Sequence, residues 1–366
     1  MGDGPSLIDL FAGAGGFSLG FMEAGFTPVL GVDNDQRAMA SYAANFPSAV
    51  ALVEDIEALE GEDLLDAAEI ESCDVIIGGP PCAAFSVGGI RDVDDERRDL
   101  VFEFGRIVRE VGARYFVMEN VPGILAPPFD AVLAEFCREM ENADYRVAKP
   151  WILDSSDFGV PQRRRRVFVA GAMLGLPLPI RPTQSTCARP TVKDAISDLE
   201  ALETQIPDTA GEVTYVPGNE SPYAERMRLD VAGGNSNATI RRVGTRLTGC
   251  ARVAHSPAVK KRFKSVTHGK IDAISRFYRL HPERAAPTIR AGTLPSRGSH
   301  TAPRPIHYLF PRCITVREAA RLQSLPDWFK VDSTKWRGYM QVGNAVPPLL
   351  ARAVAGSLKL AMDESA

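Results

Sequence analysis

The sequence predicts an α/β protein in which helices cover both faces of a parallel sheet, followed by a smaller, irregular domain. Strand and helix patterns alternate over the first 170 residues, as is typical of parallel sheets. A proline-rich joint follows at residues 176–182, and beyond it the periodicity weakens while glycine, serine, threonine and arginine become more frequent. The 366 residues, of which 45% are hydrophobic, can bury a large core.

The elements follow in order from the apolar runs and their flanking residues. The predicted strands are residues 7–11, 29–32, 51–53, 74–77, 115–118 and 166–171. The predicted helices are a segment that follows a glycine turn and ends near Ala24, then residues 36–45, 100–111, 129–142 and 316–324, and a last helix that begins after Pro347 and Pro348 and runs to about Met362. Thr315, with Glu318 three residues later, predicts a capping box at the start of the fifth helix.

Polar or reactive residues follow several of these strands. They are the glycine turn, Asp33, Asp55, Cys82 and Glu119. Ligands of α/β sheets bind at the carboxyl ends of the strands, so we expect these residues to line one edge of the sheet.

Cys82 comes directly after Pro80 and Pro81 at a strand end. Proline fixes φ and restricts the residue before it, so this cysteine is expected on a stiff loop that suits a nucleophile. A single cysteine is more often a buried apolar filler, and the loop alone leaves both interpretations open.

Four segments together are more specific: IDLFAGAGGFSLGF (8–21), GGPPCAAFS (78–86), VMENV (117–121) and QVGNAVPP (341–348). Their order and spacing resemble the DNA (cytosine-5)-methyltransferase family of bacterial type, from Ile8 to Ala355, most weakly between about residues 182 and 286. The resemblance implies a Rossmann-like, S-adenosylmethionine-dependent catalytic domain at residues 1–182. It also implies a target-recognition domain at 183–335 and a segment, 336–366, that returns to the catalytic domain.

In that family a cysteine thiolate adds to carbon 6 of a flipped cytosine, which lets carbon 5 accept a methyl group. The resemblance assigns the nucleophile to Cys82 and the contact with ring nitrogen 3 to Glu119. Arg164 and Arg166 alternate along one face of a strand and are expected to face the site, with Arg166 bonding the cytosine carbonyl oxygen. Alternatives are an ion pair at Glu119 and a plain basic patch at the four consecutive arginines.

The resemblance also implies the cofactor site. Asp33 would bind the ribose hydroxyls, Asn34 and the pair Asp55 and Ile56 would lie at the adenine, and Phe11 would pack on it with Phe17 beneath. The full predicted set is Phe11, Ala12, Gly13, Gly15, Gly16, Phe17, Asp33, Asn34, Asp55, Ile56, Pro80, Leu100, Asn344 and Ala345. From the residues alone, the turn could instead be dinucleotide-binding or structural, and Asp33 and Asp55 could be helix N-caps.

The charge distribution indicates a nucleic-acid surface. The formal net charge is −4, but residues 241–284 hold twelve basic residues against two acidic ones, a net charge of +10. A phosphate-binding surface explains this bias, and a solvated basic face is the alternative. The residues predicted to contact DNA are Ser86, Arg97, Thr288 and Arg290.

Composition limits the remaining possibilities. No apolar run reaches 18 residues and no signal peptide is expected. The six cysteines form no Cys-x-x-Cys pair, which predicts a reducing cytoplasm and no metal site. The family resemblance implies that the protein is associated with the nucleoid. We expect a monomer on double-stranded DNA, either solitary or paired with a separately acting restriction endonuclease.

Two other functions remain open on the same fold. One is a tRNA cytosine-5 methyltransferase, whose branch carries a Cys-Phe-Thr signature that this chain lacks. The other is an inactive DNA-binding module, which the intact Cys82, Glu119 and Asn344 disfavour. The chain departs from many relatives at Ala83, where they carry glutamine, so one auxiliary side-chain contact is missing.

Overall fold

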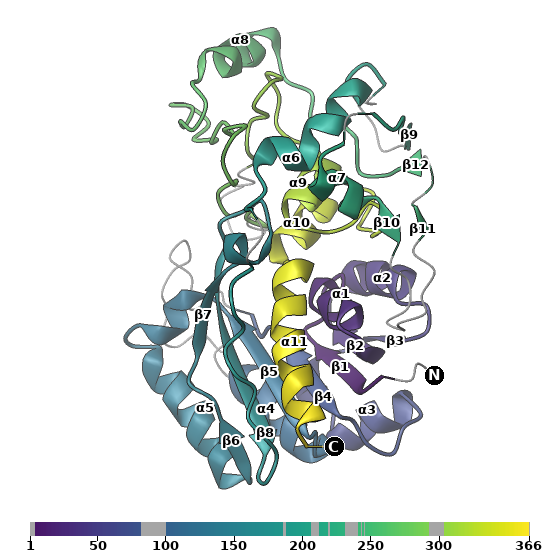
Figure 1. Cartoon of the computed structure of the whole chain (residues 1–366), viewed down its shortest axis with the longest axis vertical. Helices are drawn as coiled ribbons and strands as arrows, with labels where there is room; N and C mark the ends of the chain where they lie inside the picture. Colours follow the sequence, from purple (N-terminus) through teal and green to yellow (C-terminus); the bar gives the residue numbers. More distant parts are fainter. Residues whose placement is uncertain are drawn as a thin grey trace.

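The computed structural model describes residues 4–81, 100–185, 188–205, 212–218, 220–230, 241, 242, 244, 246–292 and 304–365. In this part of the chain the central element is an eight-stranded sheet of order β3-β2-β1-β4-β5-β8-β6, in which β7 also pairs with β8. Figure 1 shows the sheet and its helices in one lobe and a second lobe beyond the carboxyl ends of the parallel strands.

Five strands form the parallel half of the sheet. They are β1 (Ser6–Leu10), β2 (Thr27–Asp33), β3 (Val50–Val53), β4 (Val75–Gly78) and β5 (Tyr115–Asn120). The strands β1, β4 and β5 are buried on both faces, which explains their nearly continuous apolar sequences. All five were predicted, with bounds within two residues.

The other three strands correct the expectation of a parallel sheet. The strands β6 (Tyr145–Val147), β7 (Trp151–Asp154) and β8 (Arg165–Met173) add to β5 in antiparallel fashion. Only ten residues separate β7 from β8. A connection this short without a crossover helix joins antiparallel neighbours, whereas parallel strands need a longer crossover.

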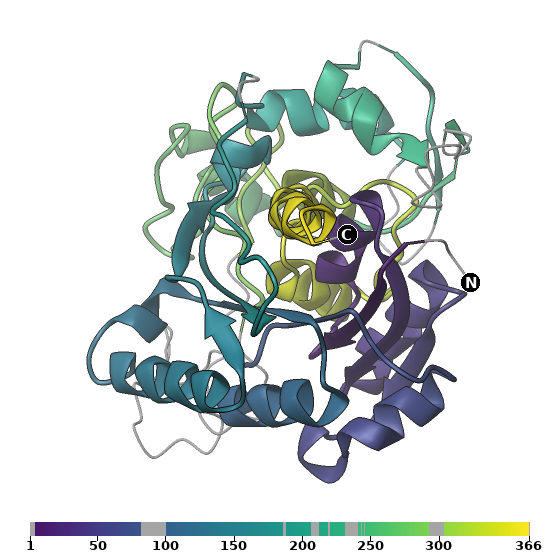
Figure 2. The ribbon, with the colours of Figure 1, turned by 60° about the horizontal axis from the view of Figure 1, so that its bottom comes forward.

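Helices cover both faces, as Figures 1 and 2 show. They are α1 (Gly16–Glu23), α2 (Gln36–Asn45), α3 (Gly61–Ala67), α4 (Leu100–Val111), α5 (Asp130–Asn142) and α11 (Pro348–Asp363). Leu7 packs in one core with α1 and α11, whereas Ile8 packs in another with α3, α4 and α5. A Cβ added to Gly20 would lie 2.3 Å from the Cβ of Ala351, so α1 and α11 touch through their backbones.

The second lobe is built from short elements. Its helices are α6 (Val192–Ile196), α7 (Pro222–Met227), α8 (Pro257–Ser265), α9 (Val316–Leu322) and α10 (Lys335–Asn344). Its strands are β9 (Val213–Thr214), β10 (Leu229–Asp230), β11 (Arg241–Arg242) and β12 (Arg246–Leu247). Within the described residues, the short 3-10 helices are η1 (Ile56–Ala58), η3 (Pro122–Leu125), η4 (Ser155–Phe158) and η5 (Ser197–Leu202).

Buried ion pairs hold this lobe together. The guanidinium of Arg321, which is fully buried, bonds both Asp198 and Asp327. The capping box of Thr315 and Glu318 at the start of α9 is confirmed. Charged groups therefore replace part of an apolar core around α9, and each one is paired as burial requires.

The last two helices include a long apolar stretch. The stretch Lys335–Asp363 is the single candidate, among the described residues, long and apolar enough to span a membrane, and 67% of its most apolar window is buried in the fold. The helix α11 has its apolar residues against α1 and the sheet, which is the position of a core helix.

Candidate active site

The glycine turn lies between β1 and α1 and is fastened to the end of β2. The backbone N–H of Ala12 donates to the carbonyl of Val32 over 3.0 Å, and that of Gly13 donates to Asp33 Oδ2 over 3.0 Å. The other carboxylate oxygen of Asp33 accepts from the N–H of Asp35 over 2.9 Å. Asp33 thus fixes the turn, while Asp35, and not Asp33, caps α2.

Two glycines make the tight approach possible. Gly15 has φ of +92°, and a Cβ there would lie 2.2 Å from the Phe46 ring. Gly16 has an ordinary φ, but its Cβ would lie 2.7 Å from the carbonyl oxygen of Val346 and 2.9 Å from the Cβ of Ala345. The C-terminal segment therefore packs directly on the turn.

The other predicted cofactor residues lie at different depths around this edge. Phe11 is half-buried, with φ of +59°, which is uncommon for a residue other than glycine. Asn34 and Asn344 are exposed, Ala345 and Leu100 are half-buried, and Pro80 is buried.

Two predicted residues have local structural roles. The side chain of Phe17 is 4% exposed and packs edge-on against Phe21 and Phe168, so it belongs to the core and not to the surface of the turn. Asp55 caps η1 by accepting from the N–H of Glu57, which was the alternative interpretation of this residue, and Ile56 is buried beside it.

Glu119 forms an ion pair at the end of β5. Its Oε1 lies 2.7 Å from Nε of Arg166 on β8, and both side chains are largely buried. The adjacent Asn120 donates to the carbonyl of Pro80 and accepts from the N–H of Val121. A Cβ on Gly79 would lie 3.3 Å from Glu119 Oε2, so the carboxylate lies beside the segment that leads into Cys82. Cys82, Ser86 and Arg97, and also Ala83, lie outside the described residues.

Arg164 differs from Arg166 in its contacts. It is 2% exposed, and its Nη1 donates to the carbonyl of Ile289 over 3.1 Å. Thr288 Oγ1 in turn donates to the carbonyl of Arg163 over 2.8 Å. Arg164 and Thr288 therefore join β8 to the second lobe, while Arg290 is exposed next to them.

The sequence analysis did not identify two buried polar residues near the site. Gln162 is fully buried and links Ile289 to Gln323, whose side-chain amide donates to the carbonyl of Ala345. Asp9 on β1 is 1% exposed and accepts from both N–H and Oγ of Ser18 on α1. A carboxylate inside the apolar run of β1 was the available signal for Asp9.

Burial raises the pKa of both carboxyls near the turn. Desolvation raises the pKa of Asp9 to about 7, against the hydrogen bonds from Ser18. Desolvation also raises the pKa of Asp33, and the N–H groups of Asp35 and Gly13 partly offset it.

The sheet and its edge define the class of protein. A glycine turn with a carboxylate at the end of the next strand, beside a buried carboxylate–arginine pair, is the arrangement of an α/β enzyme that binds a nucleotide-like cofactor. Residues 6–360 match the family model of the C-5 cytosine-specific DNA methylases. The chain belongs to this family and is a DNA (cytosine-5) methyltransferase, as the motifs predicted.

Individual relatives agree with this assignment. The chain is 41% identical over 365 residues to the Type II methyltransferase M.XorII of Xanthomonas oryzae pv. oryzae, covering 98% of this chain and 85% of the relative. It is 34% identical to M.DdeI of Desulfomicrobium norvegicum, covering 96% and 87%. A prophage-encoded DNA modification methyltransferase of E. coli has a similar crystal structure, with a TM-score of 0.83 at 32% identity and coverage of 98% and 99%.

The raised pKa of Asp9 makes a testable contribution to stability. The folded protein holds the Asp9 proton more tightly than the unfolded chain, so this contribution is complete below about pH 4 and is lost as the pH rises through about 7. Between these values, Asp9→Asn should remove a slope of up to about 1.4 kcal/mol per pH unit from the free energy of unfolding. Urea titrations at several pH values measure it, with Asp66→Asn on the exposed face of α3 as the control. Parallel pH curves for wild type and Asp9→Asn would contradict the expectation.

Proposed function

We propose that this enzyme transfers a methyl group from S-adenosylmethionine to carbon 5 of cytosine in a specific double-stranded DNA sequence. The observation that carries the proposal is the ion pair of Glu119 and Arg166, which lies beside Gly79 at the start of the segment leading into Cys82. The relatives named above are Type II methyltransferases, which supports a role as the modification enzyme of a restriction–modification system or as a solitary methylase.

The residues at the glycine turn fit the cofactor. The backbone of the turn lies at the carboxyl edge of the sheet, where a ligand would bind. Asp33 supplies a carboxylate that can accept hydrogen bonds from two ribose hydroxyls. Phe11 and Asn34 would lie along the adenine, and Asn344 and Ala345 near the methionine portion. The bound cofactor supplies an electrophilic methyl group.

The reaction itself is assigned to residues around β5 and β8. The Cys82 thiolate forms a bond to carbon 6 of cytosine, while Glu119 in its protonated form donates a hydrogen bond or its proton to nitrogen 3, which takes up the displaced electron density. Carbon 5 would then form a bond to the methyl group as the bond between that group and the cofactor's sulfur breaks. A water takes the proton from carbon 5, the electrons of that bond re-form the 5,6 double bond, and the thiolate leaves.

Arg166 has two roles in this scheme. Its ion pair orients the Glu119 carboxylate, and its Nη1 donates to the carbonyl of Arg165 over 2.8 Å, so the bond to the cytosine carbonyl oxygen is assigned to the N–H groups that are left. Arg164 is proposed to act indirectly, from a buried position. Its hydrogen bond to the carbonyl of Ile289 keeps the second lobe next to the strand that carries Arg166.

The DNA side is assigned to the second lobe, with residues 1–182, 183–335 and 336–366 as catalytic, target-recognition and returning segments. A duplex hides carbon 6 in the base stack, so the cytosine must be flipped out. Thr288 and Arg290 lie at the junction of the lobes and would contact the backbone near that base. The enzyme would act as a monomer in the cytoplasm, on nucleoid DNA, with any restriction endonuclease acting separately.

The basic segment 241–284 divides into two groups of residues. Arg262 is ion-paired with Asp272, and Arg279 donates to the carbonyls of Phe263, Lys264 and Val266 at the end of α8. These two arginines stabilise the lobe. Lys260 and Lys261 on α8 are exposed and are proposed to contact DNA phosphates.

One experiment tests the proposed function as a whole. Bisulfite sequencing of DNA from a methylation-free host that expresses the chain should show 5-methylcytosine within one short recurring sequence. Methylation confined to tRNA would favour the alternative substrate, and unmodified nucleic acid would favour an inactive DNA-binding module.

Cys82→Ser should reduce methyl transfer to background, because a hydroxyl is far less ionised than a thiol and adds poorly to carbon 6. Duplex binding should remain. Incorporation of tritiated methyl groups into DNA measures the effect, with Cys137→Ser on α5 as the matched control. Near wild-type turnover by Cys82→Ser would exclude the covalent mechanism.

Asp33→Ala should weaken cofactor binding by about 1.5–3 kcal/mol, the value of a charge-assisted hydrogen bond and an unmet partner. Asp33→Asn keeps an acceptor for the N–H of Gly13 and should lose less. Calorimetry with S-adenosylmethionine measures both. Equal affinities for wild type and Asp33→Ala would remove this residue from the cofactor site.

The double substitution Lys260→Gln and Lys261→Gln should reduce the slope of log K against log salt by up to about 1.8, at about 0.9 for each phosphate contact. Target and random duplexes should weaken alike, since phosphates carry no sequence information. The matched control is Lys149→Gln with Lys359→Gln in the first lobe. An unchanged slope would mean that α8 presents only a solvated face, and loss of target binding alone would mean base contacts.

A further inference from the structure

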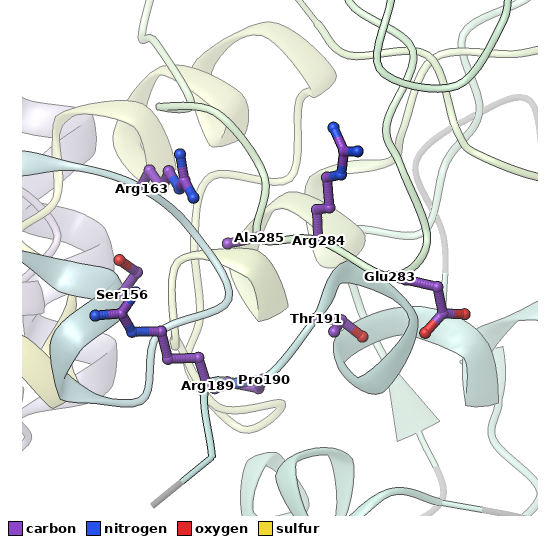
Figure 3. A pocket seen from close by; sticks show the side chains of 8 residues that line it. All are labelled: Ser156, Arg163, Arg189, Pro190, Thr191, Glu283, Arg284 and Ala285. Carbon is purple, nitrogen blue, oxygen red and sulfur yellow. The ribbon is translucent and has the colours of Figure 1, made fainter. Parts of the chain in front are cut away.

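A cavity of about 200 Å³ lies at the junction of the two lobes, outside the site described above. Its lining combines three chain segments: Ser156 and Arg163 from the first lobe, residues 189–191 from the linker, and residues 283–285 from the second lobe. Three of the eight lining residues are arginines, and one, Glu283, is acidic. Figure 3 shows Arg163 and Arg284 on either side of Ala285.

The walls of this cavity are fixed by main-chain hydrogen bonds. The N–H of Val192 donates to the carbonyl of Arg284 over 2.9 Å, and that of Arg163 donates to the carbonyl of Ala286 over 2.8 Å. The backbone of each of these two arginines is therefore held in place by a hydrogen bond to a different chain segment. The cavity needs no rearrangement of the chain to present its side chains to a ligand.

The ion pairs around the cavity do not neutralise all of its basic residues. Arg189 is ion-paired with Asp157, and Glu283 lies 3.8 Å from Lys193 with both side chains exposed. Among the described residues, no carboxylate lies within ion-pair distance of Arg163 or Arg284, and both side chains are exposed. Two guanidinium groups without a carboxylate partner, on residues that line one cavity, are an arrangement that can bind an oxyanion, and phosphate in particular.

We propose that this cavity binds a phosphodiester group of the DNA backbone, away from the flipped base, between Arg163 and Arg284. This inference rests on the proposed function, because it requires that the enzyme binds DNA. Arg163 adjoins Thr288 through the hydrogen bond at its carbonyl, so the cavity continues the junction that is proposed to face the duplex. Arg163 alternates with the two arginines assigned to the reaction and has no part in the catalytic scheme.

The test uses Arg163→Gln, Arg284→Gln and the double variant of the full chain with a short duplex of mixed sequence. A phosphate contact is independent of sequence, so the unidentified target is not needed. Each single variant should weaken binding up to about tenfold at 0.1 M salt, and the double variant should lower the salt slope by about 0.9, for one shared phosphate. The losses should not add in a double-mutant cycle.

Two further variants test the sign of the charge effect on duplex affinity and provide a control. Glu283→Gln removes the carboxylate of the lining and should strengthen duplex binding. Arg138→Gln changes an exposed arginine on α5 and should leave affinity and slope unchanged. Thermal unfolding of all variants should match wild type, because the exposed Arg163 and Arg284 side chains support no other part of the fold.

Four outcomes would overturn the inference. If the wild type binds DNA and the double variant has an unchanged salt slope, the cavity is not part of the DNA interface, and the proposed function is unaffected. A slope reduced by about 1.8 with additive losses means two separate surface contacts. Saturable binding of inorganic phosphate tighter than about 1 mM, lost in the double variant without a change in DNA slope, identifies a free anion as the occupant. Wild type that binds no duplex removes both proposals.

Discussion

The structure depends on one pairing, between the segment that enters β8 and residues 286–289 of the second lobe. The N–H of Arg163 donates to Ala286, the N–H of Ala286 donates to Pro161, and the side chains of Gln162, Arg164 and Thr288 add three more hydrogen bonds across the same junction. These groups are largely buried, so breaking the pairing would leave several polar atoms unsatisfied. The pairing therefore fixes the second lobe against the strand that carries Arg166.

The same hydrogen bonds continue toward the glycine turn. Gln162 bonds Gln323, Gln323 bonds the carbonyl of Ala345, and Ala345 packs on Gly16. Both glutamines are fully buried, and a buried amide is stable only when its donors and acceptors are paired. The edge assigned to the cofactor and the junction assigned to DNA are thus held by a single polar network, although their residues are far apart in the sequence.

The sequence predicted the parts of the fold that are encoded locally. The helices α2 and α4 have the predicted bounds to the residue, because apolar spacing and flanking residues specify them. The strands β6 and β7 were missed, and the direction of β8 was wrong because no local pattern encodes it. In the site, the motif predicted the sheet edge and residue Glu119. The partner of Arg164 is 125 residues away and Phe17 faces the core, which only the packed structure determines.

The second lobe shows why a protein of net charge −4 can still offer a basic surface. Around α9 the arginines are buried against carboxylates: Arg321 with Asp198 and Asp327, and Arg312 with Glu318. Opposite charges lie next to each other in these groups and offset one another, so they add little field at the surface, whereas the desolvation cost of any one charge alone would be large. The exposed lysines of α8, together with Arg163 and Arg284 at the junction cavity, are not paired in this way with any carboxylate that the structure describes. The net charge of the chain therefore does not describe the charge of its surface. Paired arginines stabilise the interior of the lobe, whereas unpaired cations are exposed and can bind a polyanion.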